Sequence, residues 1–166
     1  MMHIPLVTVI GKSGCGKTTM LEKLVAEFKS RNYKLATIKH HSHRGFDIDK
    51  PGKDSWRFAQ AGSDHVVIAS PDKIASYRKI DYELSLDEIS ANISDVELIL
   101  VEGYKQAGKP ALEVVRLANS RELIGSDEQR FAVAADFPLN SGVPQFDLND
   151  VRGIADLIEK RFMERM

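Results

Sequence analysis

Disulfides, long apolar runs and an excess of charge are all missing from this 166-residue sequence. Its one cysteine, Cys15, cannot form an internal bridge, which excludes a disulfide-stapled module and indicates a reducing compartment. No charge-free apolar run approaches the roughly 20 residues that a membrane-spanning helix needs, and the first residues lack a signal-peptide pattern. We therefore expect a cytoplasmic protein without a membrane partner.

The charges nearly cancel, with 23 Lys and Arg against 24 Asp and Glu. Proteins dedicated to nucleic acids are usually basic, so we expect no nucleic-acid partner. The balance is uneven along the chain, however. Residues 1–60 carry 11 basic and 5 acidic side chains, whereas residues 61–166 carry 12 and 19. This asymmetry indicates that the N-terminal part handles an anionic ligand, although two oppositely charged solvated faces would give the same count.

Short β-branched runs alternate along the sequence with segments whose apolar residues recur at helical spacing. This alternation predicts an α/β fold, a mostly parallel twisted sheet flanked by helices, in a single domain over residues 1–166. The expected strands are residues 4–10, 34–39, 65–69, 74–80, 96–101, 112–117 and 131–135. The expected helices are residues 17–30, 54–61 and 85–93, with a closing helix that Asn149 or Asp150 starts.

A phosphate-binding motif follows the first predicted strand. Residues 11–18 match G-x-x-x-x-G-K-[ST] in full, between a strand and a helix as the motif requires. Glycines let consecutive backbone N–H groups point at phosphates, and the helix N-terminus adds partial positive charge. Lys17 would bridge the β- and γ-phosphates as a catalytic cation, and the Thr18 hydroxyl would ligate Mg²⁺. The nucleotide-binding candidates here are Gly11, Lys12, Ser13, Gly14, Cys15, Gly16, Lys17 and Thr18.

A carboxylate ends the most strand-like segment of the second half, where residues 96–101 run into Glu102 and Gly103. A buried strand in this position delivers its last side chain to the edge of the sheet beside the phosphate loop. Glu102 would then act as a catalytic residue that polarises a metal-bound or attacking water. Most P-loop NTPases place Asp here, which would put Glu102 at one remove from the magnesium. The alternative is an exposed glutamate at a strand end.

Residues 40–54 form a long polar loop that contains His40, His41 and His43. Three hypotheses fit these histidines: a transition-metal site, recognition of an anionic ligand, or a solvated loop. Adjacent His40 and His41 would point to opposite faces of a strand, which weakens the metal hypothesis. Asp47 and Asp49 are better placed as ligands of a nucleotide's Mg²⁺, unless they only belong to an Asp-rich turn. The guanine motif [NT]-K-x-D is absent, so the residues alone do not separate GTP from ATP.

Several segments together resemble the MobB family of molybdopterin-guanine dinucleotide biosynthesis adaptor proteins. They are GKSGCGKTTMLEKL, TIKHHSH, FDIDKPGKDSWRFAQAG, ELILVEGYK and VAADFPLN, in order over about 140 residues. The resemblance implies a P-loop fold of the signal-recognition and MinD-like class, GTP binding with at most slow hydrolysis, and a homodimer. It also implies a helper role beside the guanylyltransferase that attaches GMP to molybdopterin.

The same resemblance assigns roles to individual residues. It implies that Gly11 to Thr19 hold the phosphates, that Asp49 and Glu102 flank the magnesium, and that His40 to His43 lie in a loop facing molybdopterin or its guanine dinucleotide. Lys12 stands where related dimeric ATPases carry a lysine that reaches the partner's nucleotide. Two other functions remain open: a P-loop small-molecule kinase or ATP-dependent ligase, and a nickel-delivery GTPase prompted by the histidines.

Overall fold

The computed structural model describes residues 4–43 and 45–163, which fall into two compact units. The first, here called the sheet unit, comprises the described residues of Met1–His40 and Ser85–Met166. The second, the hairpin unit, comprises those of His41–Leu84. None of the helices in the described residues is long and apolar enough to span a membrane.

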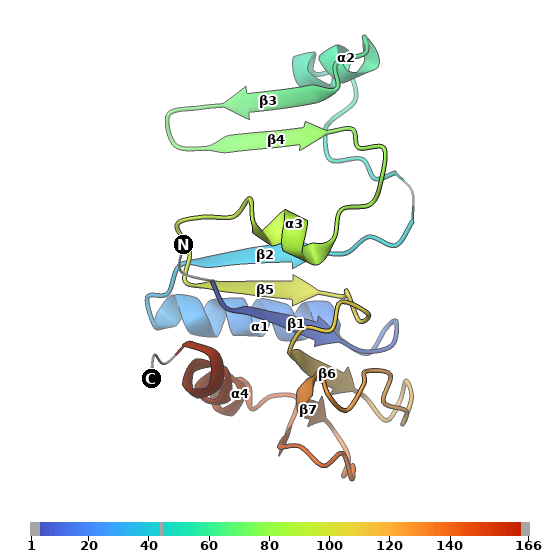
Figure 1. Cartoon of the computed structure of the whole chain (residues 1–166), viewed down its shortest axis with the longest axis vertical. Helices are drawn as coiled ribbons and strands as arrows, with labels where there is room; N and C mark the ends of the chain where they lie inside the picture. The colour runs from blue at the N-terminus through green and yellow to red at the C-terminus, as the bar shows by residue number, and fades with distance from the viewer. Residues whose placement is uncertain (1–3, 44, 164–166) are drawn as a thin grey trace. The chain divides into compact units, whose positions relative to one another are not determined.

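The sheet unit is built on a six-stranded sheet with the order β2-β5-β1-β6-β7-β8 (Figure 1), and every neighbouring pair is parallel. Its strands are β1 (Leu6–Ile10), β2 (Leu35–Lys39), β5 (Leu98–Glu102), β6 (Ala111–Val115), β7 (Arg130–Ala135) and β8 (Gln145–Phe146). Because β1 lies between β5 and β6, the loop that follows β1 is flanked by the ends of both. This arrangement positions the phosphate-binding motif.

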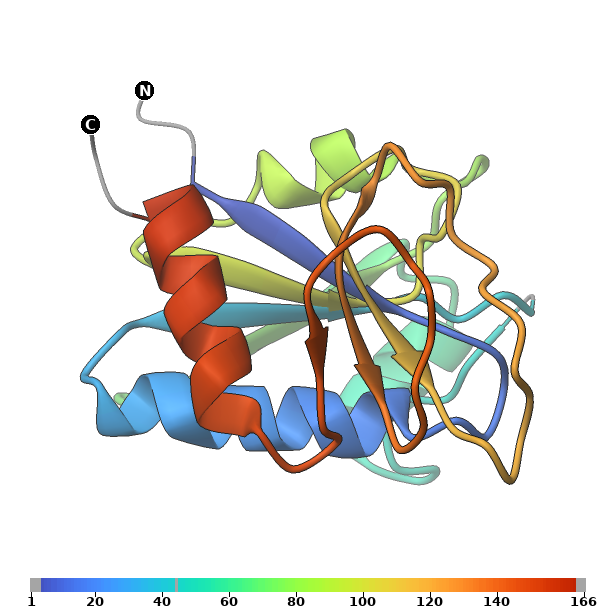
Figure 2. The same ribbon diagram turned by 90° about the horizontal axis from the view of Figure 1, so that it is seen from below.

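Helices cover both faces of this sheet (Figure 2). One face carries α1 (Lys17–Ser30) and α4 (Val151–Ile158), which η1 (Glu159–Met163) continues, and the other carries α3 (Leu86–Ser90). The helix starts follow from the sequence: Ser85 and Glu88 form a capping box at α3, and Asp150 accepts a hydrogen bond from the Gly153 N–H at α4.

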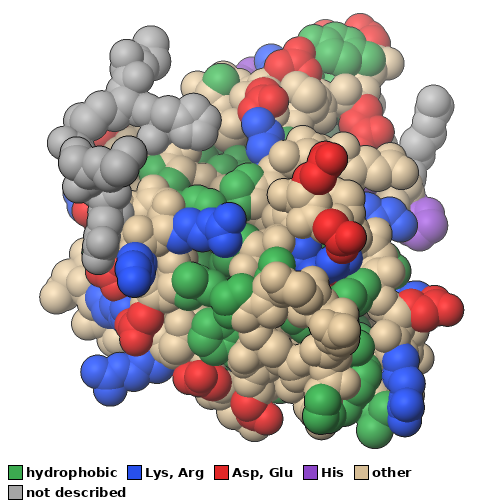
Figure 3. All heavy atoms as spheres, turned by 60° about the horizontal axis from the view of Figure 1, so that its bottom comes forward, with side chains coloured by type: hydrophobic (Ala, Val, Ile, Leu, Met, Phe, Trp, Pro, Cys, Tyr) green, Lys and Arg blue, Asp and Glu red, His purple; other side chains and the backbone are tan. Residues whose placement is uncertain are grey.

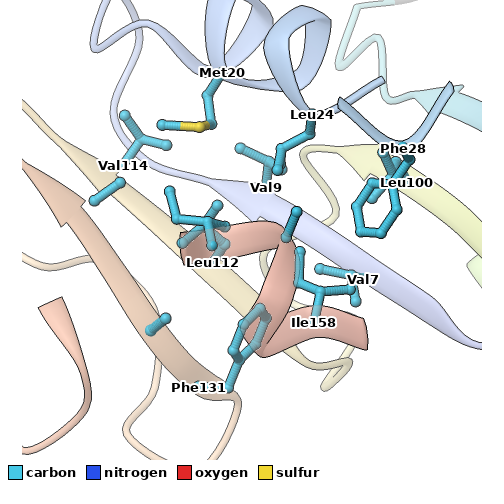
Figure 4. Close-up of a cluster of buried hydrophobic side chains, with 14 of the residues drawn as sticks. Val7, Val9, Met20, Leu24, Phe28, Leu100, Leu112, Val114, Phe131 and Ile158 are labelled. Carbon is cyan, nitrogen blue, oxygen red and sulfur yellow. The ribbon is translucent and has the colours of Figure 1, made fainter. Parts of the chain in front are cut away.

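The largest buried cluster lies between the sheet and the α1 and α4 helices (Figure 4). Met20, Leu24 and Phe28 lie one turn apart on α1 and form one apolar stripe. Figure 4 shows them with Val7, Val9, Leu100, Leu112, Val114, Phe131 and Ile158. Burying a side chain of this size contributes about 1.5–3 kcal/mol to stability. The cluster therefore holds α1 on the sheet, and this fixes the end of the phosphate-binding loop that leads into the helix.

The hairpin unit contains α2 (Asp54–Gln60) and the antiparallel strands β3 (His65–Ala69) and β4 (Ile74–Arg78). Val66 is the one buried hydrophobic residue among its described positions. Large apolar side chains on both strands, such as Ile68 and Ile74, are instead exposed. Hydrogen bonds along the ladder and around Tyr77 therefore take a larger part in holding this unit together than a core does.

The predicted α/β fold with a mostly parallel sheet and flanking helices is confirmed. The 17–30 helix and the 65–69 strand have the predicted bounds, and the other predicted elements are found with shifted ends. The two-residue strand β8 was not predicted, and neither was the separate sheet that β3 and β4 form. That residues 1–166 behave as a single domain stays a prediction.

Candidate functional site

The phosphate-binding motif forms the turn between β1 and α1. Gly11 begins it with φ 148°, and a Cβ at this position would clash with the Val114 carbonyl oxygen and lie 2.6 Å from Cys15 Sγ. The neighbouring strand β6 therefore approaches the backbone so closely that only glycine fits. The α1 N–H groups at the other end of the turn have no side-chain cap. A turn with free N–H groups at a helix N-terminus suits an anion.

Lys17 folds back over this loop. Its Nζ donates hydrogen bonds to the carbonyl oxygens of Gly11 at 3.0 Å and Lys12 at 2.8 Å. The ammonium is thereby held on the loop instead of extending into solvent. This position is suited to a side chain that contacts phosphates bound by the loop.

Thr18 and Glu102 come together at the start of α1. The Thr18 hydroxyl donates to Glu102 Oε2 at 2.9 Å, and Lys39 Nζ lies 3.6 Å from Glu102 Oε1. Only 13% of the Glu102 side chain is exposed, so strand β5 does bring this carboxylate beside the loop. Gly103 follows with φ 94°, and a Cβ there would lie 3.0 Å from His40 Cβ. The oxygen atoms of Thr18 and Glu102 are ligands of the kind that Mg²⁺ prefers.

The other residues of the motif play different parts. Cys15 is 1% exposed, and burial raises the pKa of its thiol while the nearby Lys17 acts in the opposite direction. A thiol in this state fills space and is a weak nucleophile. Ser13, Gly14 and Thr19 are exposed. Together with Gly16 they complete the predicted nucleotide-binding set on one continuous stretch of chain.

The loop between β6 and β7, which no sequence motif indicated, contacts the phosphate-binding loop. Asn119 Nδ2 donates to the Ser13 carbonyl oxygen at 2.9 Å, and Lys12 forms an ion pair with Glu122. In this structure the lysine that was expected to reach a partner's nucleotide is thus engaged within its own chain. Glu113, a carboxylate inside the otherwise apolar β6, is the one sign in the sequence that this strand has a polar partner, but it does not indicate a contact with the phosphate-binding loop.

The three loop histidines do not act as one group. The His40 ring stacks on Tyr104 within the sheet unit, with centroids 4.3 Å apart. His41 and His43 belong to the hairpin unit, where their rings meet edge to face at 5.8 Å. Across residues 4–43 and 45–163, no three His, Cys, Asp or Glu side chains converge on a point that could hold a metal ion. The nickel hypothesis therefore gains no ligand set here.

Asp49 also lies in the hairpin unit. It accepts hydrogen bonds from the Tyr77 hydroxyl and from the Lys50 N–H, at 2.9 and 2.8 Å. Hydrogen bonds from Ser55 and Tyr77 hold the pKa of the Asp49 carboxyl below its usual value. Asp47 is exposed. Asp49 is thus kept ionised and oriented inside its own unit, and its assignment to a magnesium site stays a prediction.

Acidic and basic side chains are interspersed on the face that Figure 3 shows, and neither sign forms a continuous field there. The loop after β1 carries two lysines, Lys12 and Lys17. A parallel sheet with β1 near its centre, this loop and the Thr18–Glu102 pair together define a P-loop NTPase fold, which is built for nucleotide binding.

Comparison with known proteins narrows this class. Residues 6–136 match the family model MobB, molybdopterin guanine dinucleotide synthesis protein B, and the chain belongs to this family. The molybdopterin-guanine dinucleotide biosynthesis adapter protein of Haemophilus influenzae is 39% identical over 159 residues, covering 95% of this chain and 89% of that protein. The Escherichia coli adapter protein is 37% identical over 161 residues, covering 93% and 91%.

Solved structures carry the same fold. The crystal structure of Bacillus subtilis MobB superposes with a TM-score of 0.79 over 97% of this chain and 99% of that one, at 23% identity. A crystal structure of molybdopterin-guanine biosynthesis protein B gives a TM-score of 0.71 at 29% identity, covering 93% and 98%. The fold expected from the family resemblance is therefore confirmed.

Proposed function

We propose that this chain is a GTP-binding adapter in molybdopterin-guanine dinucleotide biosynthesis, with at most slow intrinsic GTPase activity. The observation that carries the proposal is the P-loop of a MobB-family chain, in which Lys17 is held on the loop and Thr18 is paired with Glu102. An adapter needs to bind its nucleotide but does not need to hydrolyse it quickly. The hydrogen bond from the Thr18 hydroxyl to Glu102 supports a position for this carboxylate at one remove from the magnesium.

In this proposal different residues of the loop contact different parts of the nucleotide and its metal ion. The backbone N–H groups of residues 11–16 bind phosphate oxygens, and Lys17 moves from the loop carbonyls to the β- and γ-phosphates. Thr18 would give its hydroxyl oxygen to Mg²⁺, and Glu102, which accepts a hydrogen bond from that hydroxyl, would lie beside the ion. The family resemblance also assigns Asp49 to the magnesium site. Magnesium, when bound, supplies the positive charge that neutralises neighbouring phosphates.

The proposed partners follow from the family. They are GTP, molybdopterin or its guanine dinucleotide, the molybdenum-cofactor guanylyltransferase, and a second copy of the chain in a homodimer. His40, His41 and His43 are assigned to the cofactor-facing loop. The expected compartment is the cytoplasm, where the other components of such a pathway work in a reducing environment.

Calorimetry with Mg²⁺ tests nucleotide binding. We expect GTP to bind more tightly than ATP, and Lys17→Ala to weaken GTP binding by at least about a hundredfold, because a charge-assisted contact to phosphate is lost. Lys23→Ala is the matched control: it removes the same charge from the same helix, at a side chain that bonds Asn149 instead of the loop. Equal affinity for both nucleotides would refute the GTP assignment.

The adapter role needs a separate experiment. We expect the chain to co-purify with the molybdenum-cofactor guanylyltransferase when GTP and Mg²⁺ are present. The Lys17→Ala variant serves as the nucleotide-free comparison. If neither form associates with the enzyme under any nucleotide condition, the adapter role is wrong even where GTP binding holds.

A further inference from the structure

An arginine lies against the phosphate-binding loop. Arg116 directly follows β6, the strand that pairs with β1 and approaches Gly11. A Cβ built on Gly16 would lie 3.5 Å from Arg116 Nη2 and 3.8 Å from its Cζ. Gly16 immediately precedes Lys17 and is the N-cap of α1. The guanidinium therefore stands next to the end of the loop that is expected to face phosphates.

Within residues 4–43 and 45–163, no carboxylate forms an ion pair with this guanidinium. Among the residues that the structure describes, two other basic side chains near the loop have acidic partners, since Lys12 pairs with Glu122 and Lys39 lies near Glu102, while Lys17 bonds backbone carbonyl oxygens. No ion pair or hydrogen bond of the Arg116 side chain is found there. Its positive charge, after that of Lys17, also opposes the rise in the pKa of Cys15 inside the loop. An unpaired guanidinium at an anion-binding turn is suited to receive an anion.

The segment that carries Arg116 is held in place from both sides. At its far end Glu113 accepts hydrogen bonds from the Gly125 N–H at 3.2 Å and from Arg130 Nε at 2.8 Å. At its near end Asn119 bonds the Ser13 carbonyl oxygen. The base of the Arg116 side chain thus has a fixed position relative to the loop, and only the side chain needs to move to reach a ligand.

We propose that Arg116 is a further phosphate-binding residue, which contacts the β- or γ-phosphate of the nucleotide from the side of strand β6, opposite to Glu102. The inference rests on the proposed nucleotide binding and names a residue of the same site. Arg116 offers a planar fork of donors that matches two phosphate oxygens at once, which Lys17 as a point charge does not. Contacts of this type give more affinity the more phosphates the ligand carries.

The test compares GTP, GDP and GMP binding, in the presence of Mg²⁺, to the wild type and three variants. We expect Arg116→Gln to weaken GTP binding about tenfold or more and GMP binding about twofold or less, with Arg116→Lys in between. Arg121→Gln is the matched control, because Arg121 carries the same charge in the same loop but lies over the Phe137 ring, 5.8 Å from its centroid. We expect it to leave all three affinities within twofold.

The outcomes separate this inference from the proposed function. If the wild type binds GTP, Lys17→Ala weakens binding by at least about a hundredfold and Arg116→Gln stays within twofold, Arg116 has no phosphate role while the nucleotide site stands. Equal losses in Arg116→Gln and Arg121→Gln would also overturn the inference, since the effect would be general electrostatics. If the wild type binds no nucleotide, both proposals fail. Unchanged thermal unfolding of the variants shows that lost binding is not lost folding.

Discussion

The sheet unit and the hairpin unit distribute their apolar side chains in opposite ways. The sheet unit buries three clusters, on both faces of its strands. Nine large hydrophobic side chains of the described residues are exposed, and all but Leu117 belong to the hairpin unit. These eight are Phe46, Ile48, Phe58, Val67, Ile68, Ile74, Ile80 and Tyr82.

This difference indicates a difference in role. The phosphate-binding loop is carried by strands and a helix that pack from both faces, which suits a site whose donors must be positioned within fractions of an ångström. A two-stranded sheet with an exposed apolar surface is of marginal stability in isolation. This difference predicts that substitutions in the sheet unit lower stability and nucleotide binding more than substitutions in the hairpin unit do.

The largest expected effect is in the buried pair that anchors the Arg116 loop. Glu113→Ala leaves the buried Arg130 guanidinium without its partner and removes the acceptor of the Gly125 N–H. We expect the free energy of unfolding to fall by about 3–5 kcal/mol, measured by urea denaturation. Asp127 also pairs with Arg130, but its own side chain is 95% exposed, so Asp127→Ala should change stability little. Similar losses in both variants would contradict the importance of burial.

A pair of truncations compares the two units directly. Leu100→Ala leaves a cavity under α1, and we expect it to lower the free energy of unfolding by about 2–5 kcal/mol. Ile68→Ala in the hairpin unit removes a side chain that is 47% exposed, and its expected cost is under about 1 kcal/mol. Both are read from the same urea curves. A hairpin variant as damaging as the sheet variant would show that β3 is covered in solution.

The smallest effect concerns Asp49. Because its pKa is lowered in the folded protein, its contacts stabilise the hairpin unit above the ordinary Asp pKa of 3.8, and this stabilisation is lost as the pH falls through the lowered value. We expect Tyr77→Phe to raise the pKa of Asp49 toward 3.8, and Ser55→Ala to raise it further, since Ser55 is the larger cause. Carboxyl-carbon NMR titration measures both. An Asp49 pKa unmoved by either change would rule out these hydrogen bonds in solution.

The sequence predicted the elements that hydrophobic periodicity and capping define. The α1 stripe of Met20, Leu24 and Phe28 has a helical spacing that strands cannot imitate, and the Ser85 capping box marks the start of α3. β8 was missed because two residues are too short to show a period. The separate β3–β4 sheet was missed because a strand's sequence does not state its partner.

Some residues of the candidate site could be predicted from the sequence and others could not. The motif gives Lys17 and Thr18 by spacing alone, and Glu102 followed from a buried strand that ends beside the loop. Arg116, Asn119 and Glu122 were invisible, because their approach to the loop depends on the pairing of β6 with β1. Contacts between residues a hundred positions apart arise from topology, and no local pattern encodes them.

The two carbonyl contacts of Lys17 have a consequence for binding. A free lysine side chain has substantial rotamer entropy, which it loses when a ligand immobilises it. Here the Gly11 and Lys12 carbonyl oxygens restrict the Lys17 side chain as part of folding. Much of the rotamer entropy of Lys17 is therefore lost on folding, and less of it remains to be lost when an anion binds to the loop.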